Sequence, residues 1–226
     1  MPREYTLGSI QDERRLRLDF LKNNGEGAKA RFLAALQECH EESQREPVLA
    51  AFDFACAIDY SHPGRTSEAY LAHPLRVAEL VMRMINPARP LDTVIALLHN
   101  VLEVSEMSSV EIGERFGAIV SQSIVALTVD RARQWDPEYK QIYYRTLREG
   151  YAGACAVKAM DKLDNIFVLC LNPDTQIRTR YLDEIDRYVV PLTIDFVPAA
   201  ADYLRKLSAD ARMFGYLKSH DVQRPS

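Results

Sequence analysis

Apolar residues recur at helical spacing along almost the whole chain. One stripe of the segment 28–43, for example, collects four apolar side chains: Phe32, Leu33, Leu36 and Cys39. No segment alternates apolar and polar residues over a length that would build a sheet. Neither a glycine-rich phosphate loop nor an internal repeat interrupts the pattern. The pattern therefore predicts an all-α fold.

Proline, glycine and capping residues divide this pattern into separate helices. Pro47 suits the first turn of a helix, where a missing amide breaks no helical hydrogen bond. Asp92 is expected to cap a single helix over 93–104, because its carboxylate can accept the free amides of the first turn. Ser108 and Glu111 predict a capping box for the next helix. The expected interruptions are the polar loop 61–70, Pro87, Pro90, Gly117, the loop before Pro137, Pro191 and Pro198.

Length and hydropathy are those of an ordinary globular chain. The 226 residues suffice for one domain over 1–226, although two small domains also fit that length. No run approaches the roughly 20 apolar residues of a membrane-spanning helix. The first 20 residues lack the apolar region of a signal peptide. We therefore expect a soluble, cytoplasmic protein with no membrane partner.

The net charge limits the classes of partner that we expect, and the cysteines indicate their own redox state. A formal net charge of −4 argues against nucleic acid as a partner, while a local basic patch could still hold a phosphorylated small molecule. The cysteines form no CxxC pair and stand in apolar helical segments, which predicts reduced, buried thiols. These residues are Cys39, Cys56, Cys155 and Cys170.

Three apolar helical segments each carry a residue that can bind a metal. His73 opens the helix after the polar loop, His99 lies in the segment 95–106, and Asp161 lies in the segment 157–165. Imidazole nitrogens and a carboxylate suit a divalent ion such as manganese, iron or zinc. Such an ion lowers the pKa of a bound water and polarises a phosphoryl oxygen.

Polar neighbours one turn away extend this pattern, and each residue also has a purely structural interpretation. Glu103 and Asn165 lie four residues after His99 and Asp161, hence on the same helix faces. Glu103 could act there as general base or acid, or be solvated at a helix end. A lone histidine in a helix is more often a hydrogen-bonded core residue than a ligand. Asp161 could simply pair with Lys158 or Lys162 on an exposed face, and spacing alone does not show that these groups converge.

Four blocks in this order resemble the HD phosphohydrolases: AYLAHPLRVAELV, ALLHNVLEVSE, GERFGAIV and VKAMDKLDNIFVL. Among these enzymes the sequence is most similar to the alarmone hydrolases of the Rel/Spo type, especially their small stand-alone form. The resemblance runs from about Ala51 to Leu171 and implies an HD-domain helical bundle. We expect the N-terminal and C-terminal helices to pack on this core, with homo-oligomerisation as the next use for them.

The resemblance also implies a reaction and a set of site residues. The family removes the 3′-diphosphate from ppGpp with one divalent ion, usually manganese, so the expected partner is a phosphorylated nucleotide. The residues that match the family's metal ligands are His73, His99, Asn100 and Asp161. Those that match its catalytic groups are Glu103 and Asn165, and those that match substrate-binding positions are Arg65, Ser67, Tyr70, Lys140 and Arg145.

Three departures from the family pattern keep a second function open. Asn100 stands where the family has the aspartate of its namesake pair, and an amide oxygen ligates a cation without negative charge. Val104 stands where a second acid belongs, and the loop 62–74 is shorter than the family loop that grips the base. We therefore expect a metal-dependent phosphohydrolase of nucleoside polyphosphates or, alternatively, an HD-domain nucleotide-binding protein without turnover. Iron-dependent oxidation is disfavoured, because dinuclear sites need more ligands than five histidines supply.

Overall fold

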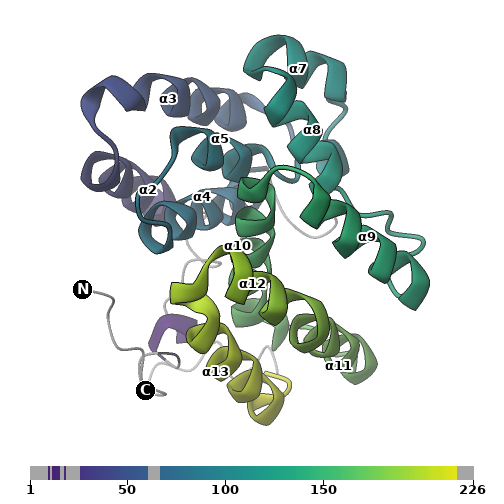
Figure 1. Ribbon diagram of the computed structural model, residues 1–226. Helices are drawn as coiled ribbons and strands as arrows, with labels where there is room; N and C mark the ends of the chain where they lie inside the picture. The colour runs from purple at the N-terminus through teal and green to yellow at the C-terminus, as the bar shows by residue number, and fades with distance from the viewer. Residues whose placement is uncertain (1–9, 11, 16–17, 19–25, 61–66, 218–226) are drawn as a thin grey trace.

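The fold is built from helices that pack around one central helix, α10 (Ala152–Leu169) (Figure 1). The structure is a computed structural model that describes residues 26–60 and 67–217, together with residues 10, 12–15 and 18. These residues form helices, turns and loops and contain no strand, so the predicted all-α fold is confirmed. None of the helices in this part of the chain is long and apolar enough to cross a membrane.

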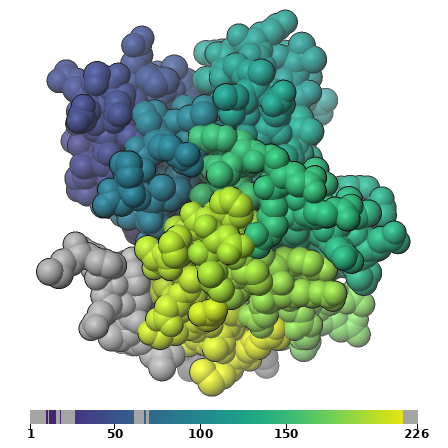
Figure 2. All heavy atoms as spheres, in the orientation of Figure 1, coloured from purple at the N-terminus to yellow at the C-terminus, as the bar shows by residue number. Residues whose placement is uncertain are grey.

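The other helices form groups on different sides of α10. Helices α4 and α5 pack on one side of it, with α2 and α3 behind them, and α12 and α13 pack on another. Figure 2 shows the N-terminal helices (purple to blue) and the C-terminal helices (yellow) at opposite ends of one face, with green residues between them. The bounds are α2 (Glu26–Cys39), α3 (Glu42–Ala57), α4 (Ser67–Met84), α5 (Pro90–Leu98), α6 (Val101–Val104), α7 (Ser109–Phe116), α8 (Ala118–Leu127), α9 (Pro137–Glu149), α11 (Thr175–Glu184), the π-helix η1 (Ile185–Val189), α12 (Val190–Phe196) and α13 (Pro198–Phe214).

Helix α10 is buried nearly all round. Every residue from Gly153 to Asp164 is buried, and the many alanines combine high helix propensity with small size, which lets neighbouring helices approach. The same stretch carries four charged side chains, which must find partners because an unpaired charge in a core is strongly unfavourable. They are Lys158, Asp161, Lys162 and Asp164.

Helices α10 and α5 approach each other closely at Gly153. A Cβ atom at this position would stand 2.0 Å from Asp92 Oδ1 and 2.4 Å from Tyr151 Cε1. Asp92 is fully buried and cannot give way freely, because it accepts hydrogen bonds from Tyr151 OH (2.8 Å) and Arg89 Nε (2.7 Å). A glycine is therefore needed for α5 and α10 to pack at this distance.

The prediction that Asp92 caps one helix over 93–104 is wrong on both points. Helix α5 begins at Pro90, and Asp92 lies inside its first turn with its carboxylate bound to side chains. The chain then turns at His99 and Asn100, and α6 follows as a separate short helix. The backbone of Asn100 has φ −104° and ψ −2°, outside the α-helical range, while its side chain donates to Tyr70 OH of α4 (2.8 Å). A side-chain hydrogen bond from Asn100 to a neighbouring helix thus takes the place of a helix that continues through this residue.

Most of the other predicted boundaries hold. Ser108 and Glu111 form the expected capping box, α7 ends before Gly117, whose φ is +89°, and α9 begins at Pro137. Pro47 is an exception, because a capping box at Glu41 starts α3 earlier and leaves the proline inside the helix. A second exception is Pro191, where the chain stays helical because η1 leads directly from α11 into α12.

We expect Gly153→Ala to lower the free energy of unfolding by roughly 3 kcal/mol, because the new methyl group overlaps Asp92 and Tyr151. Urea denaturation followed by circular dichroism measures this change. Gly113→Ala is the matched control, since a Cβ there meets Ser121 at an ordinary 3.5 Å inside a helix, and it should stabilise by roughly 0.5–1 kcal/mol. Equal effects at the two glycines would contradict the steric explanation.

Candidate metal centre

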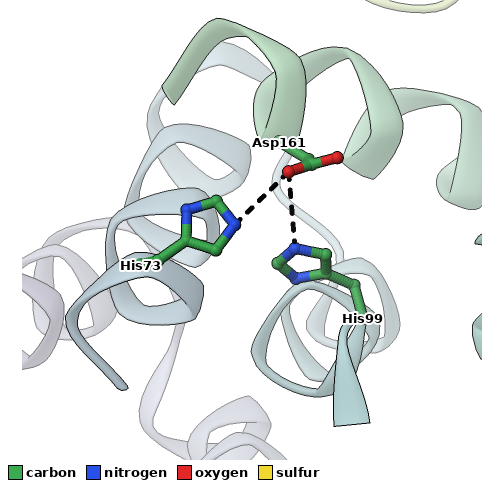
Figure 3. A group of neighbouring side chains, drawn as sticks. All are labelled: His73, His99 and Asp161. Atoms are coloured by element: carbon green, nitrogen blue, oxygen red, sulfur yellow. Dashed lines mark ion pairs between the residues drawn. The ribbon is translucent and has the colours of Figure 1, made fainter. Parts of the chain in front are cut away.

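Three buried side chains from different segments of the chain meet at one point (Figure 3). His73 comes from α4, His99 from the turn directly after α5, and Asp161 from α10, and their ligand atoms all lie within 4.8 Å of one another. The Nε2 atoms of His73 and His99 lie 3.3 Å and 3.7 Å from the same oxygen, Asp161 Oδ1. Two ligands that each lie about 2.1 Å from a transition-metal ion are themselves roughly 3–3.5 Å apart, so the spacing suits one ion.

The protonation of His73 is determined by the carboxylate behind it. Its Nδ1 lies 2.8 Å from Asp164 Oδ2, and Arg76 donates to both oxygens of Asp164, which keeps that carboxylate ionised. An ionised carboxylate only accepts hydrogen bonds, so Nδ1 carries the proton. Burial lowers the pKa of His73 to about 4 against the opposing effect of Asp161, and the ring is therefore neutral. Its Nε2 then directs a bare lone pair at Asp161.

His99 presents its second nitrogen in the same way. Its Nδ1 donates to the carbonyl of Ala96 at 2.7 Å, which leaves Nε2 without a proton in the neutral ring. That Nε2 is buried and has no hydrogen-bond partner among the described residues. Buried polar atoms without a hydrogen-bond partner are rare in folded proteins. An unprotonated nitrogen beside an anionic oxygen can bind a cation.

Asp161 is held in the ionised state between these imidazoles and two further polar groups. Its Oδ1 also accepts a hydrogen bond from Asn165 Nδ2 (2.7 Å), and its Oδ2 lies 3.2 Å from Lys158 Nζ. Burial alone would raise the pKa of Asp161, but the ammonium of Lys158 holds it well below its usual value. The pair with Lys158 considered from the sequence is thus present, but it is buried and leaves Oδ1 directed at the histidines.

The donor set therefore fits a divalent ion. Two imidazoles and one carboxylate form a common ligand set for first-row metals, and the hydrogen bond behind each histidine is the usual support for such ligands. The group formed by His73, His99 and Asp161 could hold a metal, and its geometry does not select one identity. The expectation of manganese stays a prediction.

Two predicted substrate residues, Ser67 and Tyr70, lie in the first turn of α4. The helix begins at Ser67, so the prediction of a loop over 61–70 with His73 opening the helix is wrong from Ser67 on. Tyr70 is buried, accepts from Asn100 Nδ2, and places its ring against His73 at 6.4 Å between centroids. Ser67 donates to Asp59 Oδ1 (2.8 Å) and accepts from the backbone amide of Tyr60 (3.0 Å), so it links the two sides of the preceding loop. Arg65 lies outside the described residues.

Glu103 is bound to a residue that the sequence reasoning missed. Its Oε1 accepts from the backbone amide of Val129 (3.0 Å), and its Oε2 pairs with the guanidinium of Arg131. The Glu103 side chain is 7% exposed, whereas that of Arg131 is 68% exposed. Burial would lower the pKa of Arg131, but Glu103 and then Asp161 raise it.

The two basic residues expected on α9 have different surroundings. Arg145 is exposed, whereas Lys140 is buried and lies 2.7 Å from Glu184 Oε2. Glu184 also pairs with Lys162 Nζ (3.0 Å) and accepts a hydrogen bond from Tyr144 OH (2.6 Å). This group, which we call the Glu184 clamp, joins α9, α10 and α11.

A metal-dependent gain in stability is the first consequence that can be measured. Manganese at about 100 times its Kd should stabilise the metal-stripped protein by ~2.7 kcal/mol, a rise in Tm of roughly 5–10 °C. His99→Ala should remove this rise, because Nε2 of His99 faces the ion position. His40→Ala is the matched control, since His40 is equally buried but bonds Thr93 outside the metal group. An unchanged rise in His99→Ala would exclude the site.

The Glu184 clamp predicts a specific loss of stability in acid. Burial would raise the pKa of Glu184, but Lys162 and Lys140 lower it to about 2, below the ordinary value of 4.5. The stabilisation is therefore complete above pH 4.5 and is lost as the pH falls toward 2. In Glu184→Gln the decrease in unfolding free energy over this window should be smaller, by on the order of 3 kcal/mol. Denaturant titrations at stepped pH test this, with Asp183→Asn, which alters a solvent-exposed pair with Arg212, as the control that keeps the full decrease.

Comparison with known proteins gives one sequence relative and one structural relative of note. No protein-family model matches this sequence. The chain is 28% identical over 135 residues to the guanosine-3′,5′-bis(diphosphate) 3′-pyrophosphohydrolase of Aquifex aeolicus, which covers 58% of this chain and 19% of that protein. The chain thus matches about a fifth of the length of this relative.

A solved structure has the same fold. It is described as a metazoan ortholog of SpoT that hydrolyses ppGpp, and it superimposes with a TM-score of 0.57 over 79% of this chain and 98% of the other, at 21% identity. The chain is thus similar in sequence to a ppGpp 3′-pyrophosphohydrolase and shares its helical fold with the SpoT ortholog, as the sequence motifs implied.

Proposed function

We propose that this chain is a metal-dependent phosphohydrolase of nucleoside polyphosphates, with a (p)ppGpp 3′-pyrophosphohydrolase-like reaction. The observation that carries the proposal is the buried group of His73, His99 and Asp161, in which two unprotonated nitrogens face one anionic oxygen. Homology to a ppGpp hydrolase supports the choice of substrate class.

The same three residues would hold one divalent ion, with manganese as the first candidate and the adjacent Asn100 as a further ligand. When bound, such an ion polarises a phosphoryl oxygen and lowers the pKa of a water molecule. Asn165 orients the carboxylate of Asp161 through its hydrogen bond to Oδ1.

Glu103 and Arg131 would handle the proton and the phosphate charge. Arg131 is exposed at the edge of the metal group, and a guanidinium binds phosphate oxygens in the same forked geometry as a carboxylate. A substrate phosphate can therefore take the place of Glu103 on Arg131. The released Oε2 of Glu103 is then available to accept a proton from an attacking water or to return it to the leaving group.

The remaining substrate residues are proposed with different roles. Tyr70 adjoins His73 and would line the nucleotide site, and Ser67 lies at the start of the same helix. Arg65 is proposed as a substrate residue from the sequence resemblance alone. Arg145 is exposed and can meet a phosphate directly. Lys140 is held by Glu184, so it would contribute positive charge rather than direct contact.

The alternative is an HD-domain nucleotide-binding protein without turnover, and one observation favours it. Both carboxylate oxygens of Glu103 are already bound, and Asn100, which replaces the family aspartate in our assignment, supplies no charge. Val104 cannot be exchanged simply for the second acid of the family, because it is buried in the apolar core. Asn100→Asp is therefore the sharper test of this alternative than a double substitution.

Incubation with ppGpp and manganese should release diphosphate, measured by chromatography of the products. His99→Ala and Glu103→Ala should each reduce kcat/KM by roughly 100-fold or more, since one removes a ligand and the other the proton acceptor. Glu114→Ala, which removes an exposed carboxylate on α7, should leave the rate unchanged.

The outcomes separate the two functions. Turnover by the natural sequence that disappears in both variants establishes the hydrolase. Nucleotide binding without turnover, with hydrolysis created by Asn100→Asp, establishes the regulatory alternative. Absence of both nucleotide binding and turnover would refute both functions for this substrate class.

A further inference from the structure

Among the described residues, three carboxylates at or near the metal group are each paired with a cation. One is the ligand Asp161, one is Asp164 behind His73, and one is Glu103. The pairs are Asp161 with Lys158 (3.2 Å), Asp164 with Arg76 (2.9 Å), and Glu103 with Arg131. Little uncompensated negative charge is therefore left to attract a divalent ion.

Lys158 is the cation closest to the ligand set. It lies one turn before Asp161 on α10, and both side chains are buried, at 6% and 8% exposed. Its ammonium also lies 5.5 Å from the centre of the Tyr143 ring, which stabilises a cation.

The position of this ammonium has two effects on Asp161. It occupies Oδ2, which leaves Oδ1 as the oxygen that faces His73 and His99. It also repels a second cation nearby, and this repulsion is weakly screened because the site is buried. Asp161 is the one carboxylate in the His/His/Asp group found among the described residues, so its charge is largely offset by its neighbour.

We propose that Lys158 is a positioning residue that makes ion binding depend on a phosphate group. Alone, the divalent ion binds weakly. Together with the phosphate of the ligand it binds tightly, because the negative charge of the phosphate replaces the charge of Asp161 that Lys158 offsets. By linkage, the ion must raise the affinity for phosphate by the same factor. This inference rests on the metal site of the proposed function. It adds that the ion and the phosphate bind cooperatively.

Phosphate is the anion class that this surrounding favours. Its oxygens suit hard or borderline divalent ions, and it carries enough charge to offset the ammonium. Arg131, exposed beside the site and paired there with Glu103, offers a fork of donors for the same group.

The test is a manganese titration of the metal-stripped full chain, with and without inorganic phosphate. Free manganese is measured by its EPR signal, and a titration without protein corrects for manganese–phosphate complexes. Lys158→Met removes the ammonium while keeping a long side chain, and Lys158→Arg keeps the charge. Lys162→Met is the matched control, because this equally buried lysine of α10 pairs with Glu184 rather than Asp161.

In the natural sequence, saturating phosphate should tighten manganese binding about tenfold or more. Lys158→Met should bind manganese alone about tenfold more tightly and lose most of the phosphate effect. Lys158→Arg should behave like the natural sequence, and Lys162→Met should change either value less than about threefold. Circular dichroism and Tm confirm that each variant is folded, and Lys158→Gln replaces Lys158→Met if the latter is not.

The proposal is overturned if phosphate leaves manganese affinity unchanged, if manganese binds under neither condition, or if both methionine variants behave alike. It is overturned equally if removal of the ammonium weakens manganese binding, which would mean a purely structural role. Coupled binding in a protein that hydrolyses no nucleotide would reject the proposed function and keep this inference. Hydrolysis without coupled binding would keep the proposed function and reject this inference.

Discussion

The burial of charge in α10 is the constraint on which the rest of the structure depends. Four charged side chains lie inside a helix that is otherwise apolar and surrounded by other helices. An unpaired buried charge would destabilise the fold by several kcal/mol, so each of these charges needs a partner, on a neighbouring helix or, for Lys158 and Asp161, on α10 itself. Helix α4 supplies Arg76 and His73 to Asp164, and α11 supplies Glu184 to Lys162. Packing and electrostatics therefore select the same arrangement of helices.

The metal centre is the part of this charged network in which protein groups do not complete one another. Elsewhere in α10 each buried cation meets an anion, but at Asp161 Oδ1 two lone pairs and a negative oxygen face each other. Proteins rarely retain such an arrangement without a ligand. The site's function and the stability of the core are thus linked, because the same carboxylate pairs with Lys158 and faces the histidines.

Sequence patterns predicted the all-α fold and most helix ends, because proline, glycine and capping residues act locally. They failed at Asp92 and Asn100, whose side chains bond to residues far away in the sequence or outside the expected turn. The sequence motifs suggested that His73, His99 and Asp161 converge. Periodicity alone could not predict this, because convergence depends on how the helices dock against one another. Arg131 and Asp164 were missed for the same reason. An aspartate in the apolar run of α10 was the signal that could have drawn attention to Asp164.

The contact between His73 and Asp164 joins residues that are 91 positions apart in the chain. Closing a loop of that length restricts many chain conformations before any stabilising contact forms, so long-range contacts of this kind are slow to form during folding. His99 is oriented by the carbonyl of Ala96 within α5, but His73 lacks the carboxylate that orients it until α10 docks. The metal centre is accordingly a late product of folding, and a chain that ends before α10 has none.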